Sequence, residues 1–97
     1  MKTAYRLRVP GEVTRLLRGL HPELKQKLRD ALDVLTHDAH AGKALQGELE
    51  GLRSLRVGRA RVVYRLAGGR VLEIVTVGPR ERIYEETLRL IRKARKT

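Results

Sequence analysis

The spacing of apolar residues changes along the chain and predicts the order of its elements. Residues 4–9 alternate between apolar and polar, which is the period of a strand. Residues 10–20 and 22–35 carry apolar side chains at intervals of three and four, which is the period of a helix. Pro10 and Pro22 mark the two helix starts, because a helix does not use the N–H of its first residue. A strand followed by two amphipathic helices is therefore expected.

The rest of the chain changes to the period of strands. Residues 38–51 show neither period and contain three glycines, so we interpret them as a loop that Leu45 and Leu49 anchor to the core. Residues 81–95 return to helical spacing. Three strands are expected between the loop and this helix, over 52–57, 60–67 and 70–78, with turns at Gly58-Arg59 and Gly68-Gly69.

The predicted order β-α-α-β-β-β-α defines an α+β class of fold. We expect a two-layer domain in which the helical hairpin packs on a mainly antiparallel four-stranded sheet. The helices then cover one face of the sheet and leave the other face for solvent or a ligand. A chain of 97 residues is long enough for one small core, so residues 1–97 are expected to form a single domain.

The strands carry arginines whose positions predict a binding face. Side chains alternate along a strand, so the apolar residues identify the side that the polar residues avoid. Arg61 and Arg65 then point away from the core, as do Ser54 and Arg56 of the preceding strand. Arg53 has the parity of the core, unless a bulge at the strand end redirects it. Like charges repel across neighbouring strands, so Arg56 and Arg61 beside one turn favour a bound anion.

The charge of the chain is uneven. The net charge is +11, and residues 53–97 contain thirteen Lys or Arg against four Asp or Glu, whereas residues 1–52 contain nine against seven. A strongly basic half is typical of nucleic-acid binding, although an acidic protein partner and simple solubility also fit it.

Composition excludes some site chemistry. The absence of cysteine excludes disulfides and thiolate metal sites. His37 and His40 are three residues apart, but no third ligand accompanies them, so we predict no metal. No stretch resembles a signal peptide or a membrane span, and we expect a soluble, cytoplasmic protein without membrane association.

The second half of the chain resembles the RelE-type toxins of bacterial and archaeal toxin–antitoxin modules, in the RelE/ParE superfamily. The predicted order of elements agrees over nearly the whole chain. The segments that carry the resemblance are Leu45-Gln46-Gly47-Glu48-Leu49, Leu55-Arg56-Val57-Gly58-Arg59-Ala60-Arg61-Val62-Val63-Tyr64, the strand Val71–Val77, and Gly78-Pro79-Arg80-Glu81-Arg82-Ile83-Tyr84.

The resemblance implies a toxin that cleaves mRNA in the A site of the 70S ribosome. The mRNA's own 2′-hydroxyl attacks the adjacent phosphate, so neither a metal nor another cofactor is implied. By position, the resemblance implies that Arg61 stabilises charge on the phosphate, that Arg80 binds phosphate and assists protonation of the leaving oxygen, that Tyr84 stacks on or orients a nucleotide, and that Arg56 holds phosphate. Further RNA contacts are expected from Arg53, Ser54, Arg59, Arg65 and Arg82.

Two alternatives to mRNA cleavage stay open. Some members of the family carry lysines where this chain has Leu52 and Ser54, and arginine is a poor general base. The two alternatives are a ParE-type toxin that inhibits DNA gyrase and a module that binds RNA or the ribosome without catalysis. Either toxin implies a RelB-like antitoxin as partner, whose acidic segment would suit the basic half.

Overall fold

A computed structural model describes residues 4–79 and 83–95 of the chain and confirms the predicted α+β fold. The succession of strands and helices is the expected one, with one short strand added inside the predicted loop. The elements are β1 (Arg6–Arg8), α1 (Gly11–Arg18), α2 (Pro22–His37), β2 (Lys43–Ala44), the 3₁₀ turn η1 (Gly47–Leu49), β3 (Leu52–Val57), β4 (Ala60–Ala67), β5 (Val71–Pro79) and α3 (Ile83–Arg95).

The sheet has five strands in the order β1-β5-β4-β3-β2. β1 pairs parallel to β5, and the other neighbours pair antiparallel. The prediction of four strands missed β2, because its two residues are too few for an alternating pattern. The β4–β5 turn also differs from the predicted two-residue turn at Gly68-Gly69. It runs over 68–70, between the paired residues Ala67 and Val71, and both Gly69 and Arg70 have positive φ.

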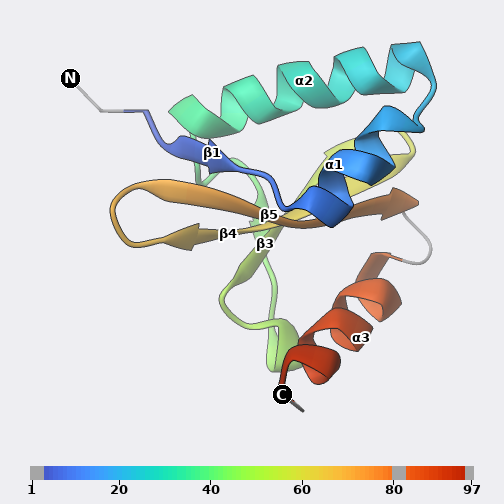
Figure 1. The fold of residues 1–97 in the computed structure, drawn as a ribbon. Coiled ribbons are helices and arrows are strands. Elements are labelled where there is room, and N and C mark those ends of the chain that lie inside the picture. Colours follow the sequence, from blue (N-terminus) through green and yellow to red (C-terminus); the bar gives the residue numbers. More distant parts are fainter. Residues whose placement is uncertain (1–3, 80–82, 96–97) are drawn as a thin grey trace.

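The helices lie on both sides of the sheet, which corrects the expectation that all of them cover one face. In Figure 1, α1 and α2 lie on one side of the sheet and α3 lies on the other. The larger core, between the sheet and α1 and α2, contains Val13, Leu28, Leu32, Leu35, Val62, Tyr64, Leu72 and Ile74. On the other face, Ile83 of α3 packs against Val63 and Leu52, and both Ile83 and Val63 are fully buried. The sheet face that was expected to be free of helices is therefore partly covered by α3.

The helices of the described ranges are short and amphipathic. The longest, α2, has 16 residues and buries Leu28, Leu32 and Leu35 on one stripe. Within residues 4–79 and 83–95, no helix has both the length and the apolar character that crossing a membrane requires.

Tyr64 of β4 fastens the loop after α2 to the core. Its hydroxyl donates to the carbonyl of Ala39 at 2.8 Å and accepts from the N–H of Gly42 at 3.0 Å, and all three residues are buried. Gly42 allows this approach, because a Cβ at that position would overlap the Tyr64 side chain. The loop leads directly into β2, so these contacts also set the position of the sheet edge.

We predict that Tyr64→Phe lowers the free energy of unfolding by about 1–3 kcal/mol, because it leaves a buried carbonyl and a buried N–H without a partner. Urea unfolding monitored by circular dichroism measures the change. Tyr5→Phe is the matched control, since Tyr5 is only partly buried and is expected to change the free energy by less than about 0.5 kcal/mol. Equal stability of the two variants would show that the Tyr64 hydroxyl does not hold the loop.

Candidate functional site

The β3–β4 hairpin places two arginines opposite each other. Arg56 and Arg61 are register partners on either side of the turn at Gly58, so their side chains leave the sheet on the same face. Gly58 has a φ of 60°, a conformation that glycine adopts without strain. The tight turn therefore brings two positive charges together, as the alternation of the strands predicts.

Arg61 is held in a fixed position between a hydroxyl and an aromatic ring. Its Nη1 donates to Oγ of Ser54 at 3.0 Å, and Ser54 is only 2% exposed. Its Cζ lies 5.9 Å from the centre of the Tyr84 ring, which is a cation–π distance. Arg61 is itself half-buried, so contacts on two sides restrict its guanidinium before any ligand binds.

The first turn of α3 positions Tyr84 above Arg61. Ile83 is fully buried in the smaller core, and the hydroxyl of Thr87, also fully buried, donates to the carbonyl of Ile83 at 2.7 Å. Gly78 of β5 lets this turn approach the sheet, since a Cβ there would lie 3.2 Å from Cδ1 of Ile83. The neighbouring Tyr84 is consequently anchored by its backbone, while the residue as a whole stays 37% exposed.

Lys43 is a basic residue near the site that the sequence pattern did not predict. It is the register partner of Ser54, so it projects on the same face as Arg61 and Arg56. The residue lies in the segment predicted to be a loop, and a two-residue strand gives no periodic signal. Only the pairing of β2 with β3 reveals that Lys43 belongs to this group, called here the basic cluster: Lys43, Arg56 and Arg61.

The basic cluster carries positive charge without a neutralising carboxylate in the described part of the chain. Its members form no ion pair with an Asp or Glu there, although Nε of Arg56 donates to the carbonyl of Gly58 at 3.3 Å. Like charges on one face of a sheet repel one another, and a bound anion lowers that cost. Guanidinium groups bind the oxygens of phosphate with paired hydrogen bonds. The cluster is therefore suited to a phosphate group.

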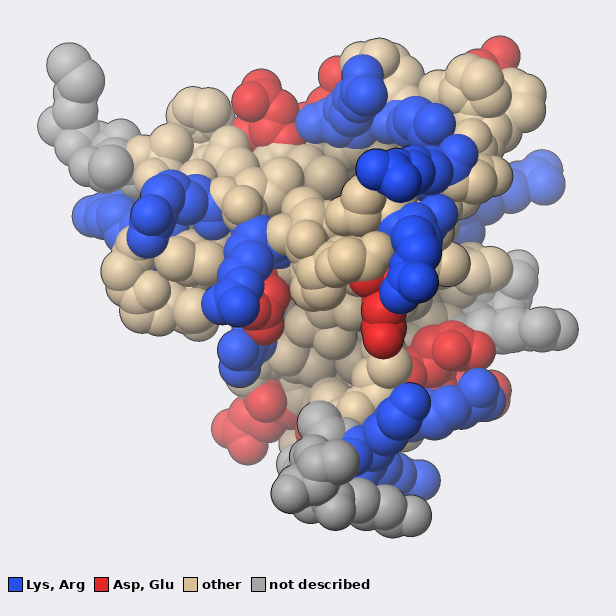
Figure 2. Space-filling model, in the orientation of Figure 1, with Lys and Arg blue, Asp and Glu red and all other residues tan. Residues whose placement is uncertain are grey.

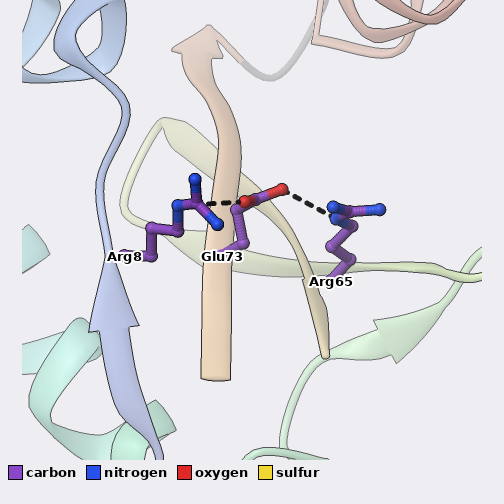
Figure 3. Close-up of polar contacts among 3 residues, drawn as sticks. All are labelled: Arg8, Arg65 and Glu73. Carbon is purple, nitrogen blue, oxygen red and sulfur yellow. Dashed lines mark hydrogen bonds and ion pairs between the residues drawn. The ribbon is translucent and has the colours of Figure 1, made fainter. Parts of the chain in front are cut away.

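Arg65 shares the face of Arg61 but has an acidic partner. Its Nε lies 2.7 Å from Oε1 of Glu73, and Nε of Arg8 lies 3.5 Å from the other oxygen of the same carboxylate. The three side chains come from β4, β5 and β1, and Figure 3 shows the carboxylate between the two guanidiniums. Arg65 is four residues from Arg61 along β4, which is about 13 Å. It therefore belongs to a separate, partly neutralised group.

Arg53 lies on the opposite face from the basic cluster, which corrects its placement among the RNA-facing residues. Its Nη2 donates to the carbonyl of Gly42 at 2.6 Å and to that of His40 at 3.1 Å. No bulge redirects it: Arg53 pairs with Tyr64 in regular register and keeps the parity of the core. Its guanidinium supports the same loop as the Tyr64 hydroxyl, and its Nε is buried without a hydrogen-bond partner.

The remaining predicted residues lie apart from the cluster or outside the described chain. Arg59 is exposed in the β3–β4 turn and borders an apolar groove on the side of α1, with Leu16 and Leu20. Arg80 and Arg82 lie outside the described residues. Of the nine predicted site residues, the structure thus brings together Arg56, Arg61, Ser54 and Tyr84.

The two candidate histidines take part in local contacts around the end of α2. Nδ1 of His37 lies 3.0 Å from the carbonyl of Asp33, and the carbonyl of His40 accepts from Arg53. In residues 4–79 and 83–95, no group of three His, Asp or Glu side chains is arranged to hold a metal ion.

Basic side chains also cover surfaces beyond the cluster. Figure 2 shows groups of Lys and Arg spread across the visible face, from the helical hairpin to α3, with fewer Asp and Glu between them. The positive potential is therefore broad, whereas the fixed geometry is local to Arg61. A broad field of this kind attracts polyanions, and the fixed group determines where a phosphate is held.

The family of the chain follows from a family model that matches residues 12–84. This model describes the ParE toxin of type II toxin–antitoxin systems, and the match covers well over half of the chain. The chain therefore belongs to the ParE toxin family, within the RelE/ParE superfamily. A comparison with curated proteins gave no match.

Solved structures of RelE toxins share the fold. The toxin–antitoxin complex RelBE2 of Mycobacterium tuberculosis contains a chain with 29% identity and a TM-score of 0.71, and the match covers 79% of this chain and 99% of that one. The archaeal RelE–RelB complex of Pyrococcus horikoshii gives 23% identity and a TM-score of 0.68, covering 81% and 98%. The isolated RelE toxin of Escherichia coli gives 21% identity and a TM-score of 0.68, covering 91% and 99%.

Proposed function

We propose that this toxin is an mRNA endonuclease that cleaves mRNA in the ribosomal A site and needs no metal. The proposal rests on the placement of the Arg61 guanidinium. It is held by the buried hydroxyl of Ser54 and lies beside the ring of Tyr84. A preorganised cation and a stacking surface are what a phosphodiester and its base require. The match to RelE structures also supports this proposed function.

In the proposed reaction, the 2′-oxygen of the mRNA attacks the neighbouring phosphorus and the bond to the 5′-oxygen breaks. The 2′-hydroxyl loses its proton, the leaving oxygen gains one, and the products end in a 2′,3′-cyclic phosphate and a 5′-hydroxyl. Negative charge increases on the phosphate oxygens as the new bond forms. Arg61 stabilises that charge, and one preorganised donor of this kind is worth about 2.7–4 kcal/mol.

The other residues have supporting roles in this proposal. Arg56 and Lys43 hold the phosphate, and Tyr84 stacks on a base next to it, which contributes about 1–3 kcal/mol. Arg80 keeps the role that the resemblance implies, binding phosphate and assisting protonation of the leaving oxygen. The separate group around Arg65 contributes to the general attraction of RNA.

A second candidate function is inhibition of DNA gyrase, because the matching family model describes ParE toxins. Such a toxin acts on a protein and does not require the fixed Arg61 next to an exposed tyrosine. A third candidate is a module that binds RNA or the ribosome without cutting it. The absence of lysine at residues 52 and 54 favours this third candidate, and intact bound mRNA would identify it.

We also propose a RelB-like antitoxin as the partner of this chain. The solved relatives include complexes of RelE with RelB. An acidic segment of the antitoxin would cover the basic cluster or displace α3. Beyond its buried Ile83 and Thr87, α3 is held by the partly buried Ile91 and by an ion pair from Arg92 to Glu48 at 3.2 Å, which is solvent-exposed.

If the proposed cleavage is correct, the variants should differ in their A-site cleavage activity in a specific order. On ribosomes programmed with end-labelled mRNA, Arg61→Ala should reduce A-site cleavage about 10²–10³-fold. Tyr84→Ala should reduce it about 5–150-fold, the equivalent of the stacking energy, whereas Tyr84→Phe retains most activity. Arg15→Ala, which removes an exposed arginine of α1, is the matched control and should cut normally. Intact mRNA under conditions where the wild-type protein stops growth would instead indicate gyrase inhibition or simple binding.

The antitoxin proposal predicts a change in α3. Amide hydrogen exchange over residues 83–95 should differ between the free toxin and its antitoxin complex, because either coverage or displacement changes the opening of this helix. The central strand β4 provides the internal control, since its middle is buried on both faces. Identical exchange across α3 in both states would show that the antitoxin binds elsewhere.

A further inference from the structure

A cleft next to Tyr84 shares Lys43 and Tyr84 with the proposed cleavage site, whereas its other lining residues have no role there. It has a volume of about 380 Å³ and is lined by Lys43, Ala44, Leu45, Gln46, Leu49 and Tyr84. One wall is β2 with the segment leading into η1, and the other is the start of α3. Its volume falls within the range of about 300–1,000 Å³ that small ligands occupy in proteins.

The walls of this cleft are tied together. Leu45 and Leu49 pack into the smaller core together with Ile91 of α3. The ion pair between Glu48 of η1 and Arg92 of α3 joins the same two elements at 3.2 Å. The backbone N–H of Leu45 also donates to the carbonyl of Leu52 at 2.9 Å, which continues the sheet into the cleft wall. The cleft is thus a built feature of the fold.

The lining has three kinds of chemistry that together match a nucleotide. Tyr84 with the leucines offers a flat, apolar surface on which a base can stack. Lys43 belongs to the basic cluster and offers a charge for a phosphate. Gln46 carries a carboxamide with both a donor and an acceptor, and within residues 4–79 and 83–95 this carboxamide has no hydrogen-bond partner.

We infer that this cleft is a subsite for a base of single-stranded RNA and that Gln46 reads the edge of the base. The inference rests on the proposed function, because it places the base next to a phosphate on the basic cluster. A glutamine amide forms two hydrogen bonds with the N6 and N7 edge of adenine, so adenine is the base expected to bind best. Single-stranded RNA exposes this edge, whereas a duplex hides much of it.

The chain offers a direct probe of the subsite, because Gln26 and Gln46 are its only side-chain carboxamides. Gln26 lies on α2, bonded to Asp30 at 3.0 Å, and serves as the internal control. In a ¹H–¹⁵N spectrum, 2′-O-methyl trinucleotides of adenine should shift the Gln46 amide signals saturably and leave those of Gln26 unchanged. Ribose 5-phosphate at the same concentration should not reproduce the shift. An equal shift from ribose 5-phosphate, or no shift of Gln46 with the adenine probe, would overturn the inference.

Two variants separate base recognition from charge. Gln46→Leu should reduce the preference for adenine over uracil probes by about fivefold or more, whereas Gln26→Leu should leave it unchanged. Lys43→Ala should weaken both probes alike, because it removes a phosphate contact. Unchanged preference in Gln46→Leu would contradict the role of this residue. Since a 2′-O-methyl probe cannot be cleaved, saturable binding supports the subsite even if the chain proves inactive on mRNA.

Discussion

The centre of β4 is buried on both faces, and the position of Tyr84 beside Arg61 depends on this constraint. Val62 and Tyr64 face α1 and α2, Val63 faces α3, and all three are fully buried. Burial of each such side chain contributes about 1.5–3 kcal/mol, so the strand requires a helix on either side. The helix that covers Val63 is α3, and its first turn carries Tyr84. The need to bury one valine therefore brings an aromatic ring next to Arg61.

The basic cluster is electrostatically unfavourable in the free protein but favourable for binding a phosphate. Three cations on one face repel one another, and the half-buried position of Arg61 limits the screening that water provides. The fold accepts this because the Ser54 hydroxyl and the Tyr84 ring each stabilise the guanidinium. A phosphate that binds there contacts a guanidinium that is already ordered, so little side-chain entropy is lost on binding. Charge elsewhere on the molecule is broad and exposed, or is partly neutralised as in the group around Glu73.

The strands, the helices and the outward direction of Arg56 and Arg61 could be predicted because alternation and helical spacing are local properties of the chain. Other features depend on pairing between distant segments. Lys43 reaches the site through a two-residue strand that shows no period. Arg53 follows the parity of the core, and its carbonyl partners come from a loop without regular structure. The periodicity of the sequence also does not show which face of the sheet α3 covers. The apolar Val63, which lies between two outward-facing arginines of β4, was the one indication that this face is partly covered.

In the proposed function, this chain positions an RNA phosphate for attack by the RNA's own 2′-hydroxyl. The most direct test is an mRNA with a single 2′-deoxy nucleotide on the 5′ side of the cleaved bond, presented on programmed ribosomes. Attack by the 2′-hydroxyl predicts that this one change abolishes cleavage, while the unmodified mRNA yields a 2′,3′-cyclic phosphate end. Cleavage of the deoxy substrate at an unchanged rate would exclude the 2′-hydroxyl as the nucleophile.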